Sequence, residues 1–308
     1  MILFSLLAVL LLEQLQPQPS LRFVEKNMLR LSAFLESRFN AGERRYGTIA
    51  WLLGVGVLVL VSGGVAVALA HLNPLLAWLW NTLILYLTMG FRQFSHYYTD
   101  IRLALRMGKV DNARQLLAEW RGVSTDGLSS SEIASLAIEE ALCAAHRQVF
   151  GVVACFLLLP GPCGAVLYRA SAFFAASWGT RDDEETAAFG SFARRSFAII
   201  DWLPARLTAL SFAIVGNFED AFYRWRRQAE LRPDDGLGIV LASAAGAQGL
   251  RLGTSARVAG ELAEQTGVDG GDGAHVDSMD STVGLLWRAL VLWILLLLLL
   301  GLANLVGG

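Results

Sequence analysis

Two ionisable side chains interrupt an apolar run that could otherwise cross a membrane. Asp201 and Arg206 both lie within residues 197–216, where every other side chain is uncharged. Because charge is unfavourable in lipid, such groups are candidates for function. Pro204 lies between them and disfavours helical geometry at Leu203, so a turn or kink could bring the carboxylate and the guanidinium together. Two interpretations follow: a buried pair that neutralises itself, or an anion-binding site in which Arg206 supplies the planar fork.

A second set of polar side chains precedes the third apolar run of the chain. Glu139 and His146 share one face of a predicted helix because they are seven residues apart. Two carboxylates and a histidine could bind a metal, but the spacing matches neither HExxH nor ExxH, so we predict no metal site. Polar groups that solvate the entrance of the helix are the alternative. The candidate catalytic residues are therefore Glu139, Glu140, Asp201 and Arg206.

Binding is expected from basic and aromatic residues near these positions. Tyr168 and Arg169 close the third apolar run, where such a pair is also a normal interfacial anchor. The sequence contains no P-loop, GxGxxG or GxSxG motif, so a Walker ATPase, a Rossmann enzyme and a serine hydrolase have no support. The candidate binding residues are Arg147, Tyr168, Arg169, Pro204 and Arg206.

The composition is typical of a membrane protein. Of the 308 residues, 55% are hydrophobic and 17% are charged, whereas a soluble domain carries about 25% charged residues. The net charge of -2 gives no global basic surface for phosphates, so nucleic acid is not an expected partner. The three cysteines form no CxxC motif and no disulfide framework. These features exclude an ordinary cytosolic enzyme, a disordered protein and a nucleic-acid binder.

Five apolar runs predict membrane-spanning helices, since crossing the bilayer core takes about 20 apolar residues. The runs are residues 47–70, 72–91, 149–166, 197–216 and 289–306. The first two should form a hairpin, because the link between them is very short. Residues 1–12 predict a short apolar helix that is retained, since they lack the basic start and the cleavage pattern of a signal peptide.

The distribution of basic residues predicts the orientation of the chain. Segments 92–148 and 217–284 carry basic clusters and helical patterns, so we expect both to be cytoplasmic loops. The Pro- and Gly-rich stretch 160–164 could break the third run into a helical hairpin or a re-entrant pair. We therefore predict an all-α, multi-pass protein with a single integral domain over residues 1–308 in the bacterial inner membrane. Its expected partners are the lipid bilayer and a membrane or cytoplasmic protein.

Several short stretches resemble the CobD/CbiB family of cobalamin-biosynthesis membrane proteins and its relative AmpE. They are MGKVDNAR at 107–114 with SEIASLAIE at 131–139, PCGAVLYR at 162–169, and DWLPARLT at 201–208. The last is the most specific, because the family shares its Pro-Ala-Arg-Leu-Thr element. The resemblance implies that members of the synthase kind join aminopropanol, or its phosphate, to a propionate of adenosylcobyric acid.

The chain also departs from the synthase pattern at three places. The family's acidic-Asn-x-x-Asp cluster corresponds to ALCAAHR at 141–147, and its Asn-Thr-Leu-Asp element corresponds to ASAFFA at 170–175. The His-Pro-Val element near the N-terminus is replaced by QPQP at 16–19. These departures remove polar groups that could hold substrate and metal. AmpE, in contrast, is similar in its Asp-Trp-x-Pro-x-Arg-Leu motif and in the pattern AIVGNFE at 213–219.

Two functional interpretations follow from this resemblance. The first is an AmpE-like member without catalytic activity, whose signalling or interaction role is linked to cell-wall sensing and β-lactamase induction. The alternative is an adenosylcobinamide-phosphate synthase, a ligase of cobalamin biosynthesis. A corrinoid substrate and a divalent metal are implied only by the alternative, and no cofactor is otherwise evident.

Overall fold

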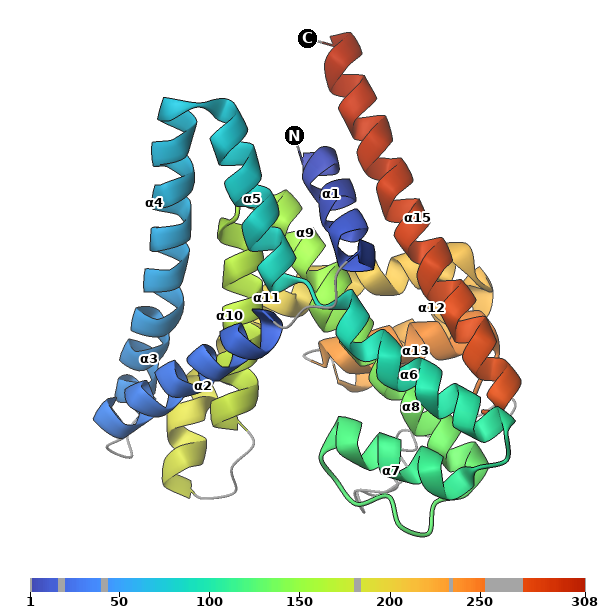
Figure 1. Ribbon diagram of the computed structural model, residues 1–308. Coiled ribbons are helices and arrows are strands. Elements are labelled where there is room, and N and C mark those ends of the chain that lie inside the picture. Colours follow the sequence, from blue (N-terminus) through green and yellow to red (C-terminus); the bar gives the residue numbers. More distant parts are fainter. Residues whose placement is uncertain are drawn as a thin grey trace. The chain divides into compact units, whose positions relative to one another are not determined.

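A computed structural model describes residues 2–15, 20–39, 44–179, 184–232, 235–252 and 274–307, which form helices joined by short connections (Figure 1). The predicted all-α fold class is confirmed. The chain separates into two compact units: unit 1 is Met1–Gly90 with Arg147–Pro204, and unit 2 is Phe91–His146 with Ala205–Gly308. The QPQP stretch at 16–19, and residues 253–273 of the predicted loop 217–284, lie outside the described residues.

Unit 1 is built around a cluster of aromatic rings. The ring of Trp178 lies 4.5 Å from that of Phe174 and 5.0 Å from that of Phe189, between centroids, and all three side chains are fully buried. The helices of the unit are α1 (Ile2–Leu15), α2 (Ser20–Phe39), α3 (Arg44–Trp51), α4 (Val57–Leu72), α5 (Pro74–Thr88), α9 (Gly151–Leu158) and α10 (Cys163–Gly179). A π-helical turn, η1 (Leu52–Gly56), continues α3 into α4.

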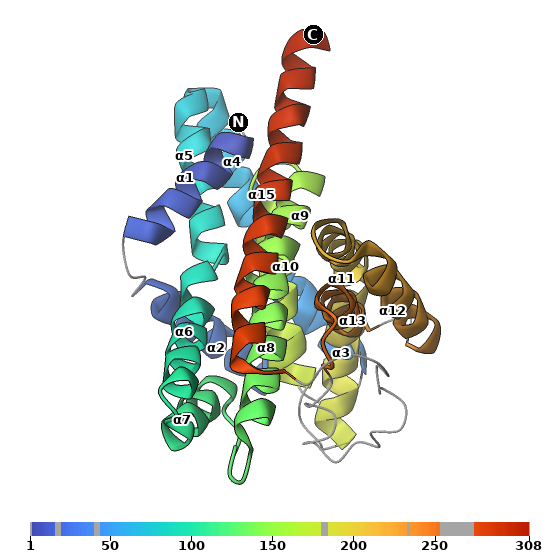
Figure 2. The same cartoon turned by 90° about the vertical axis from the view of Figure 1, so that its right-hand side faces the viewer.

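Unit 2 is organised around α8, which packs beside α6 and α15 (Figure 2). Its helices are α6 (Phe91–Arg106), α7 (Val110–Arg121), α8 (Ser130–Ala145), α12 (Phe218–Leu231), α13 (Gly236–Gln248) and α15 (Val276–Gly307). A second π-helical turn, η2 (His146–Phe150), continues α8 into α9, and α11 (Glu184–Val215) contributes residues to both units.

Four stretches of helix in the described parts of the chain are long and apolar enough to cross a membrane. They are Arg45–Leu72, Ser130–Leu158, Ala188–Val215 and Val276–Ala303. They overlap the predicted runs 47–70, 149–166, 197–216 and 289–306. The predicted span 72–91 is shorter in the structure, because Asn73 caps α5, Pro74 is its first residue and the helix ends at Thr88. Its 15 residues are fewer than the about 20 that cross a bilayer core unaided.

The second stretch begins well before the predicted run, inside the segment expected to be a cytoplasmic loop (92–148). A capping box starts α8: the Ser129 side chain accepts from the backbone of Glu132, whose Oε2 accepts from the Ser129 N–H at 2.9 Å. Nearly every following side chain of α8 is buried. Acidic residues conceal this helix in a hydropathy profile, whereas contacts with other helices of unit 2 bury it.

The run 149–166 is divided between α9 and α10, as the Pro- and Gly-rich stretch 160–164 allowed. Gly161 adopts a left-handed φ of +64°, which reverses the chain after Leu158. A Cβ atom on Gly164 would lie 1.9 Å from the carbonyl oxygen of Cys155, so the backbones of α9 and α10 touch there. The predicted single span is therefore corrected to a tight helical hairpin.

Pro204 does not interrupt α11, and the predicted turn at this residue is wrong. The helix runs without a break from Glu184 to Val215 with Pro204 inside it. Proline removes one backbone hydrogen bond, but membrane helices tolerate this because neighbouring groups satisfy the released carbonyl. Asp201 and Arg206 consequently remain on one helix, five residues apart, a spacing that corresponds to about 140° around the axis of an ideal helix.

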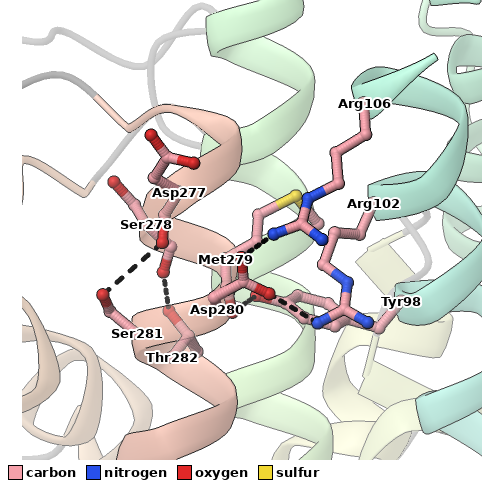
Figure 3. Close-up of polar contacts among 9 residues, drawn as sticks. All are labelled: Tyr98, Arg102, Arg106, Asp277, Ser278, Met279, Asp280, Ser281 and Thr282. Carbon is pink, nitrogen blue, oxygen red and sulfur yellow. Dashed lines mark hydrogen bonds and ion pairs between the residues drawn. The ribbon is translucent and has the colours of Figure 1, made fainter.

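The start of α15 is fixed to α6 by three side chains spaced four residues apart (Figure 3). The hydroxyl of Tyr98 donates to the carbonyl oxygen of Met279 at 2.9 Å. The guanidinium of Arg102 donates to Asp280 at 2.6 Å, and Arg106 pairs with the other carboxylate oxygen. Tyr98 is buried, whereas the ion pairs are partly exposed. The tyrosine should therefore contribute more to stability than the salt bridges do.

High pH should weaken this contact through Tyr98. Burial raises the pKa of the Tyr98 phenol above its ordinary value, so folding favours the neutral form. Its contribution is fully present below about pH 10, the pKa in unfolded chains, and is lost as the pH rises further. We expect the thermal unfolding midpoint in detergent to fall more steeply above about pH 10 for the wild-type chain than for Tyr98→Phe. Equal slopes for the two chains would contradict this role of Tyr98.

Candidate functional site

A buried tyrosine and a buried carboxylate meet in unit 1. The hydroxyl of Tyr168, on α10, donates to Oδ1 of Asp201, on α11, at 2.8 Å. Tyr168 is fully buried and Asp201 is only 4% exposed. A carboxylate removed from water needs hydrogen-bond donors, and Tyr168 supplies one. This pair joins a residue predicted to bind with a residue predicted to be catalytic.

Close packing fixes the position of the Tyr168 ring. A Cβ atom on Gly151 would lie 2.2 Å from the hydroxyl oxygen of Tyr168, so any larger residue there would force the buried tyrosine ring to move. The ring of Phe197 packs against Tyr168 with 5.5 Å between centroids. Gly151 directly follows the π-helical turn η2, and such turns occur frequently at functional sites. The local structure of α9 thus creates the space that Tyr168 occupies.

Basic side chains lie near this pair. Arg147 is exposed and, together with the thiol of Cys155, lies within electrostatic range of Tyr168. Arg169 is half-buried beside Tyr168 on α10, and Glu25 of α2 is within electrostatic range of it. Two of the predicted binding residues, Arg147 and Arg169, therefore lie within electrostatic range of Tyr168.

Unit 2 contains a second buried polar pair, formed by His146 and Thr208. Nδ1 of His146 lies 3.0 Å from Oγ1 of Thr208, and both side chains are fully shielded from solvent. His146 is the first residue of η2, and Thr208 lies two turns after Asp201 on α11. An imidazole and a hydroxyl can each donate or accept a hydrogen bond, so the direction of this contact depends on the tautomer of His146.

The predicted carboxylates of α8 have different environments. Glu139 is buried, and its Oε1 accepts from Ser135 Oγ at 3.4 Å. Glu140 forms an ion pair with Arg121 of α7 at 3.7 Å. The burial of Glu139 and His146 contradicts the alternative that both solvate the entrance of a helix. Among the described residues, no three His, Cys, Asp or Glu side chains are close enough to hold a metal ion.

Arg206 and Pro204 complete the set of predicted residues. Pro204 is buried inside α11, and Arg206 is half-buried in unit 2. The contact described for Asp201 is with Tyr168. Helix α11 continues through Pro204, so the turn that could have brought Asp201 to Arg206 does not form there.

Three features of these sites are not predicted by the sequence. Thr208 is visible there only as part of the 201–208 motif, Gly151 has no distinguishing pattern, and Tyr168, although predicted to bind, gives no indication of its contact with Asp201. Tyr168 and Asp201 are 33 residues apart, so no local spacing could reveal their contact. The order of small and large residues around Gly151 likewise gives no indication that Tyr168 packs against this glycine.

Comparison with known proteins decides the family. A family profile described as CobD/Cbib protein matches residues 6–286. The chain belongs to the CobD/CbiB family. Two of the stretches on which the resemblance was based, 162–169 and 201–208, are the ones that Tyr168 and Asp201 bring into contact.

Curated relatives of the family cover most of the chain. The chain is 31% identical over 301 residues to the cobalamin biosynthesis protein CobD of Stutzerimonas stutzeri, covering 96% of this chain and 97% of the relative. It is 34% identical to the cobalamin biosynthesis protein CobD of Chromobacterium violaceum, over 73% and 72% of the two chains. The protein of the same name from Citrobacter koseri is 28% identical, over 79% and 77%. No solved structure matches.

These relatives overturn the first functional interpretation of the sequence. The interpretation of the chain as an AmpE-like signalling protein is wrong, because the relatives are named cobalamin biosynthesis proteins. The absence of three short polar elements of the synthase pattern is weaker evidence about function than similarity along almost the whole chain. The chain is a membrane protein of the CobD/CbiB family, with apolar helices suited to the bilayer.

Proposed function

We propose that this chain is an adenosylcobinamide-phosphate synthase, which joins aminopropanol or its phosphate to adenosylcobyric acid. The similarity to the CobD protein of S. stutzeri over almost the full length of both chains carries this proposal. The overlap of the Tyr168–Asp201 contact with two family stretches supports it. We place the protein in the bacterial inner membrane, where the lipid bilayer surrounds its candidate spans.

The proposed reaction forms an amide C–N bond between a carboxyl group and an amine, breaks one carboxyl C–O bond and releases that oxygen, in net terms as water. Such a condensation requires that the two groups be oriented and that a proton be removed from nitrogen. The Asp201 carboxylate, oriented by the Tyr168 hydroxyl, has the chemistry to accept that proton. Guanidinium groups suit carboxylate and phosphate, which gives Arg147, Arg169 and Arg206 a role in binding.

Among the described residues, no three His, Cys, Asp or Glu side chains come together as an all-protein site for the divalent metal that a synthase implies. Metal ions of this kind take several oxygen ligands at once. Because the described part of the chain has no cluster of three His, Cys, Asp or Glu, it offers no such ligand set. We therefore derive no step of the reaction through a metal.

Complementation tests the proposed function directly. A bacterial strain that lacks its cobinamide-phosphate synthase, supplied with adenosylcobyric acid, should regain cobalamin-dependent growth when it expresses this chain. A control strain without the chain should not grow. Absence of growth, with the chain detected in the membrane fraction, would overturn the proposal.

Substitution of Arg206 by alanine should weaken complementation without removing the chain from the membrane. Loss of a hydrogen bond to a charged group typically costs about 1.5–3 kcal/mol, so substrate binding should fall about 10- to 100-fold. The measurement is the KM for aminopropanol phosphate in membranes that contain the variant. Arg227→Gln, which changes an exposed arginine on α12, is the matched control. An unchanged KM for Arg206→Ala would remove this residue from the binding site.

A further inference from the structure

Helix α12 begins immediately after a candidate membrane span. The stretch Ala188–Val215 ends two residues before the Asn217 cap, whose Oδ1 accepts from the backbone N–H of Asp220 at 3.3 Å. The turn between the two helices is tight, because a Cβ atom on Gly216 would lie 2.8 Å from the carbonyl oxygen of Ala247. Helix α12 therefore begins directly after the end of a candidate span.

One side of α12 is occupied by α13. Ala221 is fully buried in this contact, and a Cβ atom on Gly246 would lie 2.5 Å from the carbonyl oxygen of Asp220. In Figure 1 the two helices run across the direction of α15, the long candidate span of the same unit. A helix that lies along a membrane surface would run in this direction relative to a spanning helix.

A neighbouring side of α12 exposes large aromatic rings. We call Phe218, Phe222 and Trp225 the aromatic stripe, since their spacing places them on one helix face. The rings of Phe218 and Phe222 stack at 5.9 Å, and Trp225 meets Phe222 edge-on at 5.7 Å. Phe218 is 52% exposed and Phe222 is 44% exposed. Exposed apolar surface of this kind marks an interaction site.

Basic side chains follow along the same helix. Arg226 and Arg227 are exposed in its second half, and Arg226 reaches Glu230 at 3.1 Å. Aromatic rings collect at the boundary between lipid headgroups and acyl chains, while long basic side chains extend toward phosphate. The combination of rings and arginines just beyond the end of a span matches the chemistry of phospholipid headgroups.

We infer that α12 is an in-plane interfacial helix that binds the phospholipid headgroup layer through its aromatic stripe. The rings enter the boundary between headgroups and acyl chains, and Arg226 lies at the level of the phosphates. Such helices anchor by buried apolar area together with attraction to lipid charge. This role is separate from the proposed amide-forming reaction and does not depend on it.

Photocrosslinking in vesicles tests this surface. The full chain, with p-benzoylphenylalanine in place of Phe218, Phe222 or Tyr223, is reconstituted in phosphatidylcholine and phosphatidylglycerol vesicles and irradiated. Tyr223 is the matched control, because it is 67% exposed and lies about 100° around the helix from Phe222. We expect lipid adducts, detected by mass spectrometry, to be several-fold more abundant at positions 218 and 222 than at 223.

Two outcomes would overturn the inference. One is equal lipid labelling at 218, 222 and 223 in chains that remain in the vesicles after carbonate washing. The other is crosslinking of positions 218 and 222 to a second copy of the chain in place of lipid. The use of two stripe positions keeps the test decisive if one variant fails to insert.

Discussion

Replacement of Asp201 by asparagine should abolish cobalamin-dependent growth while the chain still inserts in the membrane. Asparagine has nearly the same size and its carbonyl oxygen can still accept from the Tyr168 hydroxyl, which donates to Asp201 at 2.8 Å. The fold should therefore persist. The substitution removes the carboxylate that we propose accepts the proton. Because general base catalysis typically contributes about 10²–10⁴-fold to a rate, we expect a loss of this size. Amide formation in isolated membranes measures the loss.

A pair of further variants separates catalysis from structure at this site. Tyr168→Phe should lower the rate less than Asp201→Asn, because it removes only the group that orients the carboxylate. If Tyr168 acts through Asp201, the double variant should be no slower than Asp201→Asn alone. Asp111→Asn, which changes an almost fully exposed carboxylate on α7, is the control for charge removal. Wild-type rates in Asp201→Asn would refute the proposed role.

Asp201 can be found from the sequence but its contact cannot, and the reason is physical. A single carboxylate in an apolar run is visible in any sequence, since its burial needs compensation. Its partner Tyr168 is on another helix, and the contact depends on the α9–α10 hairpin and on the absence of a side chain at Gly151. Such long-range contacts leave no periodic pattern in the chain.

The helices are predicted more reliably than their ends. Residues 47–70 and 289–306 are apolar enough that composition alone predicts them, and the structure places both in candidate spans. Helix α8 differs, because its capping box is evident from Ser129 and Glu132 whereas its burial is not. Pro204 is a poor guide to a helix end here, because the rule for soluble helices neglects the neighbours that satisfy a released carbonyl in membranes.

Of the glycines in the α9–α10 hairpin, Gly164 should tolerate replacement by alanine least. A Cβ atom there would lie 1.9 Å from the carbonyl oxygen and 2.4 Å from the carbonyl carbon of Cys155, which are backbone atoms that no side-chain rotation can move away. Gly164→Ala must therefore push α10 away from α9. Because Tyr168 lies one turn later on α10, the same shift should lengthen its hydrogen bond to Asp201. We expect a lower unfolding midpoint in detergent together with loss of complementation.

The same substitution elsewhere provides the control for Gly164. A Cβ atom on Gly64 of α4 would have no neighbouring atom within 4 Å, so Gly64→Ala meets open space. Alanine favours helix over glycine by about 1 kcal/mol, whereas overpacking at Gly164 should oppose folding by about 1–3 kcal/mol. The two variants should thus shift the unfolding midpoint in opposite directions. If Gly164→Ala matched Gly64→Ala in stability and activity, the close approach of α9 and α10 would not be what positions Tyr168.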